Sequence, residues 1–535
     1  MSNIGKPPCD EGVIKSGKSV APCGATSAPW ILAATILGSS MAFIDGTVVN
    51  VALPALQTNL HATVLDVQWV VESYALLLAA LLLVGGSLAD RYGRRLIFII
   101  GVGLFALASI WCGLSPNIYQ LIVARAVQGV GGALLVPGSL AIISASFDED
   151  RRGQAIGTWS GFTAITTAFG PVLGGWLIEH VSWRAVFFLN LPLAVLVLLI
   201  SLRHVPESRA GEAKTRLDWP GAALVTVGLG GLVYGLIESS RLGFTHGAVL
   251  FALIGGCALL ALFFVVETRA RNPMLPLTLF RSRNFSGANL LTLFLYTALG
   301  GVLFFLPLNL IQVQGYSATA AGAATLPFVL IMFTLSRWSG GLVKRYGAKL
   351  PLIIGPLIAA LGLALFIVAG VGGSYWTTFF PAIVVLGLGM AVSVAPLTTT
   401  VMGSVAQDRA GVASGINNAI SRTAGLLAIA AFGIVMVQAF NSHLDSRLSS
   451  LEVAPEARHI LDAGRVKLAG AEIPINLDPE TKAALKRMVI DSFMQGFRLI
   501  IMIAVCLALF SALVSWVMID GKHSVSSPVE QLAQA

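Results

Sequence analysis

Charged residues are scarce in this chain. Of its 535 residues only 11% are charged, whereas 56% are hydrophobic, and the mean hydropathy is +0.83. A soluble domain carries roughly 25% charged residues. A chain with so little charge cannot keep this many apolar residues away from water. The composition therefore excludes an ordinary soluble protein and indicates an integral membrane protein.

Metal ligands and nucleophile motifs are also sparse. The five cysteines show neither paired spacing nor zinc-ligand spacing, and the seven histidines fall in predicted loops, span ends or tails. The chain contains no phosphate-binding loop and no Gly-x-Ser-x-Gly turn, and its glycine-rich stretches lie inside apolar runs. We therefore expect no disulfide framework, no metal, no cofactor and no enzymatic activity. The first 29 residues lack an apolar core, which predicts that no signal peptide is cleaved.

Apolar runs of about 20 residues recur along the chain, and each is long enough to cross a bilayer as a helix. The strict alternation of barrel strands is absent, so the fold class predicted is an all-α membrane protein. We predict fourteen transmembrane helices, at 30–53, 68–88, 95–115, 118–142, 154–177, 183–202, 219–238, 247–267, 286–311, 319–339, 349–370, 376–400, 410–438 and 495–518.

Lysine and arginine are concentrated on one side of these spans. If the N-terminus is cytoplasmic, the inside loops contain basic clusters such as 91–95 and 151–152, while the short outside loops contain only Arg184 and Arg241. Cytoplasmic loops are enriched in lysine and arginine, so both termini are predicted to be cytoplasmic. The same rule accounts for the net charge of +8 without a nucleic-acid partner.

Short segments repeat at nearly constant spacing. The segments 86–95 (GSLADRYGRR) and 340–349 (GGLVKRYGAK) align 254 positions apart. An Asp-Arg-x-Gly segment recurs at 150 and 408, and a Leu-Pro pair recurs at 53 and 306. The spacing covers eight helices, so both copies have the same orientation. Parallel repeats of this kind are typical of secondary transporters that rock one half against the other.

The repeat divides the spans into six, two and six. It predicts two parallel six-helix bundles with two extra helices inserted between them. The segment 440–494 is predicted to be a long outer loop, since long loops are translocated largely regardless of charge. Within it, residues 479–488 predict a short amphipathic helix. The predicted parts are a cytoplasmic tail at 1–29, the first bundle at 30–202, a cytoplasmic linker at 203–218, the two extra helices at 219–267, the second bundle at 286–518 and a cytoplasmic tail at 519–535.

The loop between the second and third spans is the first candidate functional element. Its glycines permit close backbone approach and positive φ, and its aspartate precedes a predicted helix start, where a carboxylate is favourable. A simple turn with positive-inside arginines would explain the loop alone. Because the segment is repeated, we favour a charge latch that holds one conformation. The residues of this gating loop are Gly86, Asp90, Arg91, Gly93, Arg94 and Arg95.

Three charged residues inside predicted spans are candidates for proton coupling. Of the 26 acidic residues, only Asp45 and Glu72 fall clearly within a span. A buried carboxylate costs roughly 2.5 kcal/mol or more, so Asp45 should face a cavity and have a partner. The alternative is that it caps a local helix break near Gly46. Glu72 lies nearer the outer interface, where it would snorkel or line an outer gate, and Arg125 is an intramembrane cation.

Four motifs together resemble the major facilitator superfamily. The loop 86–95 is similar to the signature of that superfamily between its second and third spans. The first span is similar to that of its 14-span drug:proton antiporter family (EmrB/QacA-type), and the fourth and fifth spans also match. The matching residues are Asp45, Gly46, Thr47, Asn50 and Pro54; Arg125, Gln128, Gly129 and Gly131; and Gly170, Pro171, Gly174 and Gly175.

The resemblance implies roles for these positions. It assigns proton coupling to Arg125 acting with Asp45, and a helix hinge that keeps the site sealed to the fifth-span motif of Gly170, Pro171, Gly174 and Gly175. Arg422 would bind an anionic substrate, pair with a carboxylate or bond unwound backbone, and the residues leave these three options open. The substrate-cavity candidates are Asp45, Asn50, Gln128 and Arg422.

The predicted function is export of amphipathic small molecules by proton antiport through alternating access. A specific nutrient or metabolite transporter of the same fold and a membrane sensor that does not transport are the alternatives. We expect the bacterial inner membrane as the location. The expected partners are a small-molecule substrate, protons and membrane lipids, with a periplasmic adaptor as a candidate in a Gram-negative host.

Overall fold

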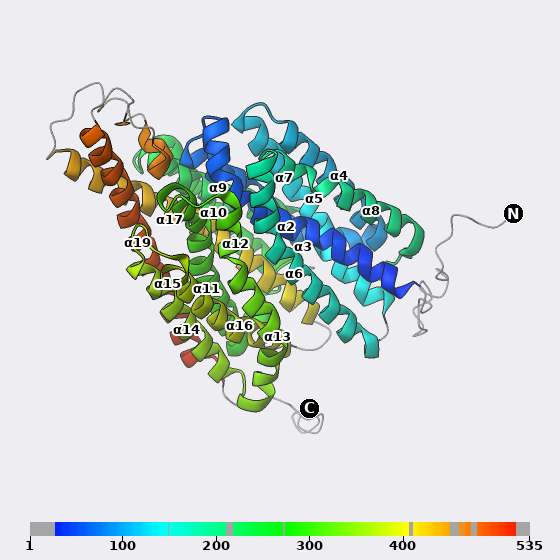
Figure 1. Cartoon of the computed structure of the whole chain (residues 1–535). Helices are drawn as coiled ribbons and strands as arrows, with labels where there is room; N and C mark the ends of the chain where they lie inside the picture. The colour runs from blue at the N-terminus through cyan, green and yellow to red at the C-terminus, as the bar shows by residue number, and fades with distance from the viewer. Residues whose placement is uncertain are drawn as a thin grey trace.

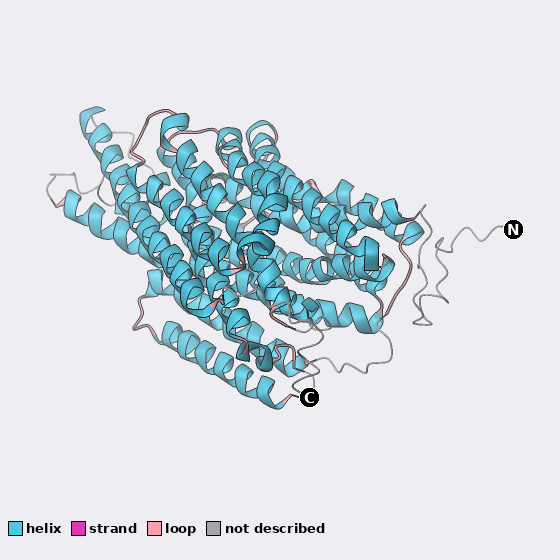
Figure 2. Ribbon diagram, turned by 90° about the horizontal axis from the view of Figure 1, so that it is seen from below, coloured by secondary structure: helices cyan, strands magenta, loops and turns pink. Residues whose placement is uncertain are grey.

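The computed structural model describes residues 27–147, 149–209, 218–270, 273–405, 410–449, 458, 461–462, 464–471 and 479–520. Residues 1–26 and 521–535 of the predicted tails, half of the predicted linker (210–217) and the first two residues of the second Asp-Arg-x-Gly copy (408–409) lie outside them. Within this part the chain is helical and contains no strand (Figures 1 and 2).

The first bundle contains six spans, the last of which is broken into α7 and α8. Helix α5 packs against α3 and α4, while α2 packs against α6 and α8. Ser39 of α2 and Ser139 of α5 are hydrogen-bonded at 2.6 Å, which ties two of these helices together in the core. The elements are α2 (Ala28–Asn59), α3 (Val64–Tyr92), α4 (Arg94–Leu114), α5 (Ile118–Ser146), α6 (Glu149–His180), α7 (Ala185–Phe188) and α8 (Asn190–His204).

The inserted pair consists of α9 (Trp219–Leu242) and α10 (Gly247–Arg269), which pack against each other. Helix α9 also contacts α3 of the first bundle and α17 (Ala410–Leu448) of the second. Most side chains of α10 are exposed at the surface of the protein, and Phe251 is 81% exposed. This exposure is expected for a helix that faces lipid. The pair therefore covers the junction between the bundles from outside.

The second bundle has the same span count, with short breaks in several spans. A 3₁₀ turn precedes its first helix, and a π-helical turn ends that helix. The elements are η1 (Leu277–Arg281), α11 (Arg283–Leu308), η2 (Asn309–Val313), α12 (Ala318–Ala324), α13 (Leu326–Tyr346), α14 (Lys349–Val368), α15 (Tyr375–Thr378), α16 (Phe380–Gly403), α17, η4 (Arg465–Gly470) and α19 (Pro479–Met518).

Thirteen helical stretches in the described part are long and apolar enough to cross a membrane. Helix α6, with 32 residues, supplies the fourteenth span and packs alongside α2. The prediction of an all-α membrane protein with fourteen spans is confirmed.

The predicted short helix at 479–488 is wrong as a separate element. Residues from Pro479 onward form the start of α19, a continuous helix of 40 residues. Leu485, Val489 and Phe493 are buried at helical spacing, and no proline follows Pro479 within the helix, so nothing ends it before the apolar span begins. Helix α17 likewise continues to Leu448, so both ends of the segment 440–494 are helical.

The repeated segments have matching backbone geometry. Gly93 and Gly347, 254 positions apart, both have positive φ, at 126° and 74°. The arginine before each repeated tyrosine lies 5.3 Å from the centre of that tyrosine ring in both copies. The copies differ at their Leu-Pro pairs. Helix α2 continues through Pro54 to Asn59, whereas α11 contains Pro307 and then changes to the π-helical turn η2.

Candidate functional site

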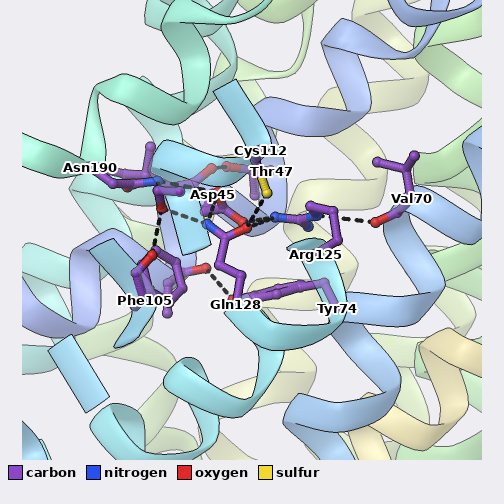
Figure 3. Close-up of polar contacts among 12 residues, drawn as sticks. Asp45, Thr47, Val70, Tyr74, Phe105, Cys112, Arg125, Gln128 and Asn190 are labelled. Carbon is purple, nitrogen blue, oxygen red and sulfur yellow. Dashed lines mark hydrogen bonds and ion pairs between the residues drawn. The ribbon is translucent and has the colours of Figure 1, made fainter. Parts of the chain in front are cut away.

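A carboxylate and a guanidinium are paired in the core of the first bundle (Figure 3). Asp45 projects from α2 and Arg125 from α5, and their side chains are 0% and 1% exposed. Nη1 of Arg125 donates a hydrogen bond to Oδ2 of Asp45. Desolvating two ions is costly, so such a pair persists only when further hydrogen bonds complete its geometry. Asp45 therefore has the partner that a buried carboxylate needs, and that partner is Arg125.

Amide and hydroxyl groups complete this geometry. Nε2 of Gln128 donates to Oδ1 of Asp45 at 2.8 Å, and its Oε1 accepts from Arg125 at 2.7 Å. Nδ2 of Asn190 also donates to Oδ1 of Asp45, at 3.3 Å. Ser109 accepts from both amides, at 2.9 and 3.3 Å. We call Asp45, Arg125, Gln128, Ser109 and Asn190 the buried polar network; it joins α2, α4, α5 and α8.

The other side of the guanidinium is held by α3. Nε of Arg125 donates to the carbonyl oxygen of Val70 at 3.1 Å, and its Cζ lies 4.2 Å from the centre of the Tyr74 ring. The hydroxyl of Tyr74 donates to the carbonyl oxygen of Ala42 at 3.2 Å. A cation over an aromatic face is stabilised electrostatically. Arg125 therefore keeps favourable contacts when the charge of its carboxylate partner is removed.

Helix α2 is continuous at Asp45, which excludes the alternative that Asp45 caps a helix break. The hydroxyl of Thr47 donates to the carbonyl oxygens of Phe43 and Ile44, as threonine does inside a helix. Gly46 is exposed, and a Cβ added there would meet no atom within 4 Å. Asp45 thus projects from an unbroken helix that borders open space at the next residue.

Glu72 does not reach the protein surface, as a snorkelling side chain would have to; its place at an outer gate stays a prediction. Its side chain is fully buried on α3, and neither carboxylate oxygen has a hydrogen-bond partner among the described residues. Trp69 and Leu76, three and four positions away, pack in an apolar cluster with α9 and α17. The inserted pair covers this face of α3 and so removes Glu72 from solvent. The structure does not bring it into the buried polar network.

The remaining cavity candidates are separate from the network. Asn50 lies five residues beyond Asp45 on α2, and its buried Oδ1 accepts no hydrogen bond in the described structure. Arg422 lies on α17, where its buried Nε has no acceptor among the described residues. Of the four candidates, only Asp45 and Gln128 are in contact.

A carboxylate caps the start of α4 beside the gating loop, although Asp90 does not provide it. Asp90 lies near the end of α3 and pairs with Arg94, one turn later, at 2.8 Å. The cap is Glu207, beyond α8, which accepts from the backbone N–H groups of Arg95 and Leu96 at 3.1 Å each. The expected position of Asp90 at the start of the next helix is therefore wrong, while the charge latch stays a prediction. The cause is that α3 continues through Asp90, so the first free N–H groups of α4 lie beyond it. Of the other loop residues, Arg91 is exposed.

Gly93→Ala is expected to destabilise the folded protein by about 1–3 kcal/mol, the usual cost of placing a side chain in such a conformation. Gly93 has a φ of 126°, and an added Cβ would lie 2.6 Å from the Glu207 carboxyl carbon. The matched control is Gly86→Ala in the same loop, where the nearest atom is 3.7 Å away. The measurement is the apparent Tm of purified protein. Equal Tm values for the two variants would contradict the assigned cap.

The bundles meet closely along α6 and α12. A Cβ added at Gly175 would lie 2.7 Å from the carbonyl carbon of Ala318, and one added at Gly322 would overlap the carbonyl of Pro171. At the same end of the bundles, Glu179 accepts hydrogen bonds from the hydroxyl and the N–H of Thr319. The two bundles are therefore in backbone contact at this seam.

The fifth-span glycines face two different neighbours. A Cβ added at Gly170 would lie 2.7 Å from Oγ1 of Thr47, and one at Gly174 would overlap the side chain of Val48, so both glycines face α2. Gly175 instead faces α12. Near this end, Nε2 of Gln312 also donates across the seam to Oε1 of Gln57 at 2.8 Å. The motif thus packs α6 into its own bundle and against the opposite one.

Sequence comparison now places this architecture among known proteins. The profile of the Major Facilitator Superfamily matches residues 35–429. The chain belongs to the Major Facilitator Superfamily. The predicted resemblance is confirmed, and this major facilitator protein is a multi-pass membrane transporter of small molecules.

Named relatives match over almost the whole chain. Multidrug resistance protein Stp of Mycobacterium tuberculosis is 35% identical over 498 residues, 91% of each protein. The tetracenomycin C resistance and export protein of Streptomyces glaucescens is 34% identical over 504 residues, 92% of each. A bacterial homologue of the human lysosomal transporter Spinster, solved in an inward-facing and unoccupied conformation, matches with a TM-score of 0.66 at 17% identity. That match covers 94% of this major facilitator protein and 100% of the solved chain, and it supports the fold alone.

Two network residues were not anticipated from the sequence. Asn190 and Ser109 both lie inside predicted apolar spans, where single polar residues are common and usually bond within their own helix. Asn190 was the more recognisable of the two, because an asparagine amide inside a span needs partners outside its own backbone.

Proposed function

We propose that this transporter exports amphipathic small molecules in exchange for protons. The observation that supports this most directly is the buried pair of Asp45 and Arg125. An ionisable side chain inside a membrane protein commonly marks a proton or substrate path. The names of the relatives from Mycobacterium tuberculosis and Streptomyces glaucescens agree with export of toxic compounds.

Asp45 is the proposed proton carrier. Arg125, Gln128 and Asn190 all donate hydrogen bonds to the Asp45 carboxylate, so protonation of Asp45 would disrupt an ion pair as well as remove a charge. Protonation removes the charge and leaves Arg125 with Tyr74 and the carbonyl of Val70. The ionised and protonated states of Asp45 therefore differ in the interactions between α2, α3 and α5. A proton can shift a conformational equilibrium only through such a difference.

Further positions in the first bundle are proposed to act with Asp45. Glu72 is proposed as a second protonation site, because its carboxyl is fully buried and has no hydrogen-bond donor among the described residues. Gln128 and Asn50 are proposed to face transported molecules from α5 and α2. Gly46, with open space beside it, lies on the same side of α2 as Asn50, one turn away.

Arg422 is proposed as the contribution of the second bundle to the cavity. Its Nε lacks an acceptor in the described structure, so an anionic or carbonyl group of the substrate can occupy that position. Arg422 lies one helical turn before Leu426, which packs in an apolar cluster with α3, so this part of α17 borders the first bundle.

The close contacts at Gly175, Glu179 and Gln57 are proposed to form the closed outer gate of alternating access. This assignment rests on the predicted orientation with both termini in the cytoplasm, which places these residues at the outer surface. Gly170, Pro171 and Gly174 are proposed to form a hinge beside this gate. The gating loop around Asp90 and Glu207 then lies at the opposite, inner end.

The proposed setting is the bacterial inner membrane, with protons and lipids as partners. In a Gram-negative host, a periplasmic adaptor is proposed to continue the path outward. The extended outer ends of α17 and α19, which reach Leu448 and begin at Pro479, offer the protruding surface for such a partner.

A panel of toxic compounds tests the proposed function. Cells that produce the protein are expected to survive higher concentrations of some amphipathic compounds than cells without it. Everted membrane vesicles should accumulate the same compounds only while a pH gradient is present. Increased uptake of a nutrient by intact cells would favour an importer, and no difference for any compound or nutrient would favour a sensor. The matched control is vesicles treated with a proton ionophore.

A further inference from the structure

The inserted helix pair contains a carboxyl pair outside the buried polar network. Asp218 immediately precedes α9, and Glu267 lies near the end of α10. The Glu267 side chain belongs to a residue that is only 3% exposed. Since α9 begins and α10 ends at the same end of the bundle, the two acids lie side by side where the pair joins the rest of the chain.

Each carboxyl group uses one oxygen for the local backbone. Oδ1 of Asp218 accepts from the N–H of Gly221 at 2.9 Å and so caps the first turn of α9. Oε2 of Glu267 accepts from the N–H of Leu275 at 3.1 Å, which fixes the chain leading to η1 and α11. These bonds hold the two groups in place and leave one oxygen on each.

The two remaining oxygens are buried and converge. Oδ2 of Asp218 and Oε1 of Glu267 have no hydrogen-bond donor among the described residues. A Cβ added at Gly221 would lie 2.5 Å from the first and 2.9 Å from the second, so both oxygens border the same point above Gly221. Two acceptors therefore face each other with no donor between them.

This arrangement requires a positive charge. Two ionised carboxylates in contact repel strongly at low dielectric, and a common solution is one proton held between them. Arg269, two residues after Glu267, is exposed, and the acidic group that acts on Glu267 is Asp218. Within the described residues no third histidine, cysteine or acidic side chain joins the cluster. Two side-chain oxygens suffice for a proton but are few for a metal ion, which prefers six or more oxygen ligands.

We propose that Asp218 and Glu267 form a proton-binding site in which one proton is shared between their facing oxygens. The proton joins the beginning of α9 to the end of α10 and, through Leu275, to the chain that enters the second bundle. Loss of the proton leaves two negative charges in contact. Their repulsion separates the beginning of α9 from the end of α10. The site is distinct from the Asp45 network, and its occupancy does not depend on whether the transporter exports or imports.

The dependence of stability on pH tests this site. Above about pH 4 the carboxyls of an unfolded chain are ionised, whereas the folded pair retains one proton. The folded state then binds more protons, so the free energy of unfolding falls as pH rises through the dissociation of the pair. We expect the apparent Tm of the purified wild-type protein to show a downward step with rising pH. Asp218→Asn and Glu267→Gln, each of which supplies an amide donor, should both lose that step.

A matched control and a second readout complete the test. Glu480→Gln changes an exposed glutamate in the first turn of α19 and should keep the wild-type step. Infrared difference spectra of the wild-type protein should show a protonated carboxyl band that disappears across the same pH range and is absent from both pair variants. This readout holds even where a variant folds poorly. An unchanged step in the pair variants, or no such band in the wild type, would overturn the proposal. A step that disappears on adding EDTA would assign the site to a divalent cation instead.

Discussion

Asp45→Asn is expected to abolish pH-gradient-driven efflux, reducing it to the level of vesicles that lack the protein. The variant cannot bind and release a proton at this position, although the asparagine amide keeps nearly the same shape. Removing one partner of a buried ion pair costs about 3–5 kcal/mol, because the other charge is left uncompensated. The contacts of Arg125 with Tyr74 and Val70 reduce that cost. The measurements are transport in everted vesicles and apparent Tm.

A double variant separates loss of coupling from loss of folding. Asp45→Asn combined with Arg125→Gln removes both charges, so its apparent Tm should exceed that of either single variant while efflux remains absent. Arg125→Ala should also lose efflux. Efflux at the wild-type rate in Asp45→Asn would remove the proton-coupling role from Asp45, and full activity in Arg125→Ala would leave that arginine with a structural role only.

Gly175→Val is expected to open the seam between the bundles and to stop transport. Its Cβ would lie 2.7 Å from both the carbonyl carbon of Ala318 and Cα of Thr319, and these backbone atoms cannot move as a flexible side chain would. Overpacking of this kind costs about 1–3 kcal/mol. Only the closed seam carries this cost, so the ratio of open to closed molecules should rise about fivefold or more.

The distance between spin labels at Asn59 and Ala320, on opposite bundles, measures this shift in a background without cysteines. Gly157→Val on the same helix is the matched control, because a Cβ there would meet no atom within 4 Å. It should leave the distance distribution and transport unchanged. If both variants gave the wild-type distribution, the seam at Gly175 would not determine the closed state.

The fold was predictable because its determinants are local and repetitive. Apolar runs specify spans, the repeat around Gly86 and Gly340 specifies two similar bundles, and a glycine with positive φ follows each repeated tyrosine. The boundaries were less predictable at α19. Its polar first turns resemble a separate surface helix, and only packing of Leu485 and Val489 shows that the helix continues into the membrane.

The candidate site was predictable in part. Asp45 and Arg125 are recognisable because charge is rare inside apolar spans, and their chemistry suggests that they pair. Glu207 could not be found in this way, since its cap on α4 joins positions 112 apart and depends on how the chain turns after α8. Two further acids, Glu238 and Glu267, are buried although they are the last residues of predicted spans. Both lie near helix ends, where sequence alone suggests solvent.

The different ends of α2 and α11 bear on how a duplicated protein evolves. At the matching proline, one copy continues as a regular helix to Asn59, while the other changes to the wider π-helical turn at Asn309. Turns of this type are an uncommon departure that often occurs at functional positions. The two descendants of one ancestral unit are therefore mechanically unequal. A gene with the two bundles in the opposite order would encode the same number of spans, but it would encode a different protein because the π-helical turn would lie in the first bundle.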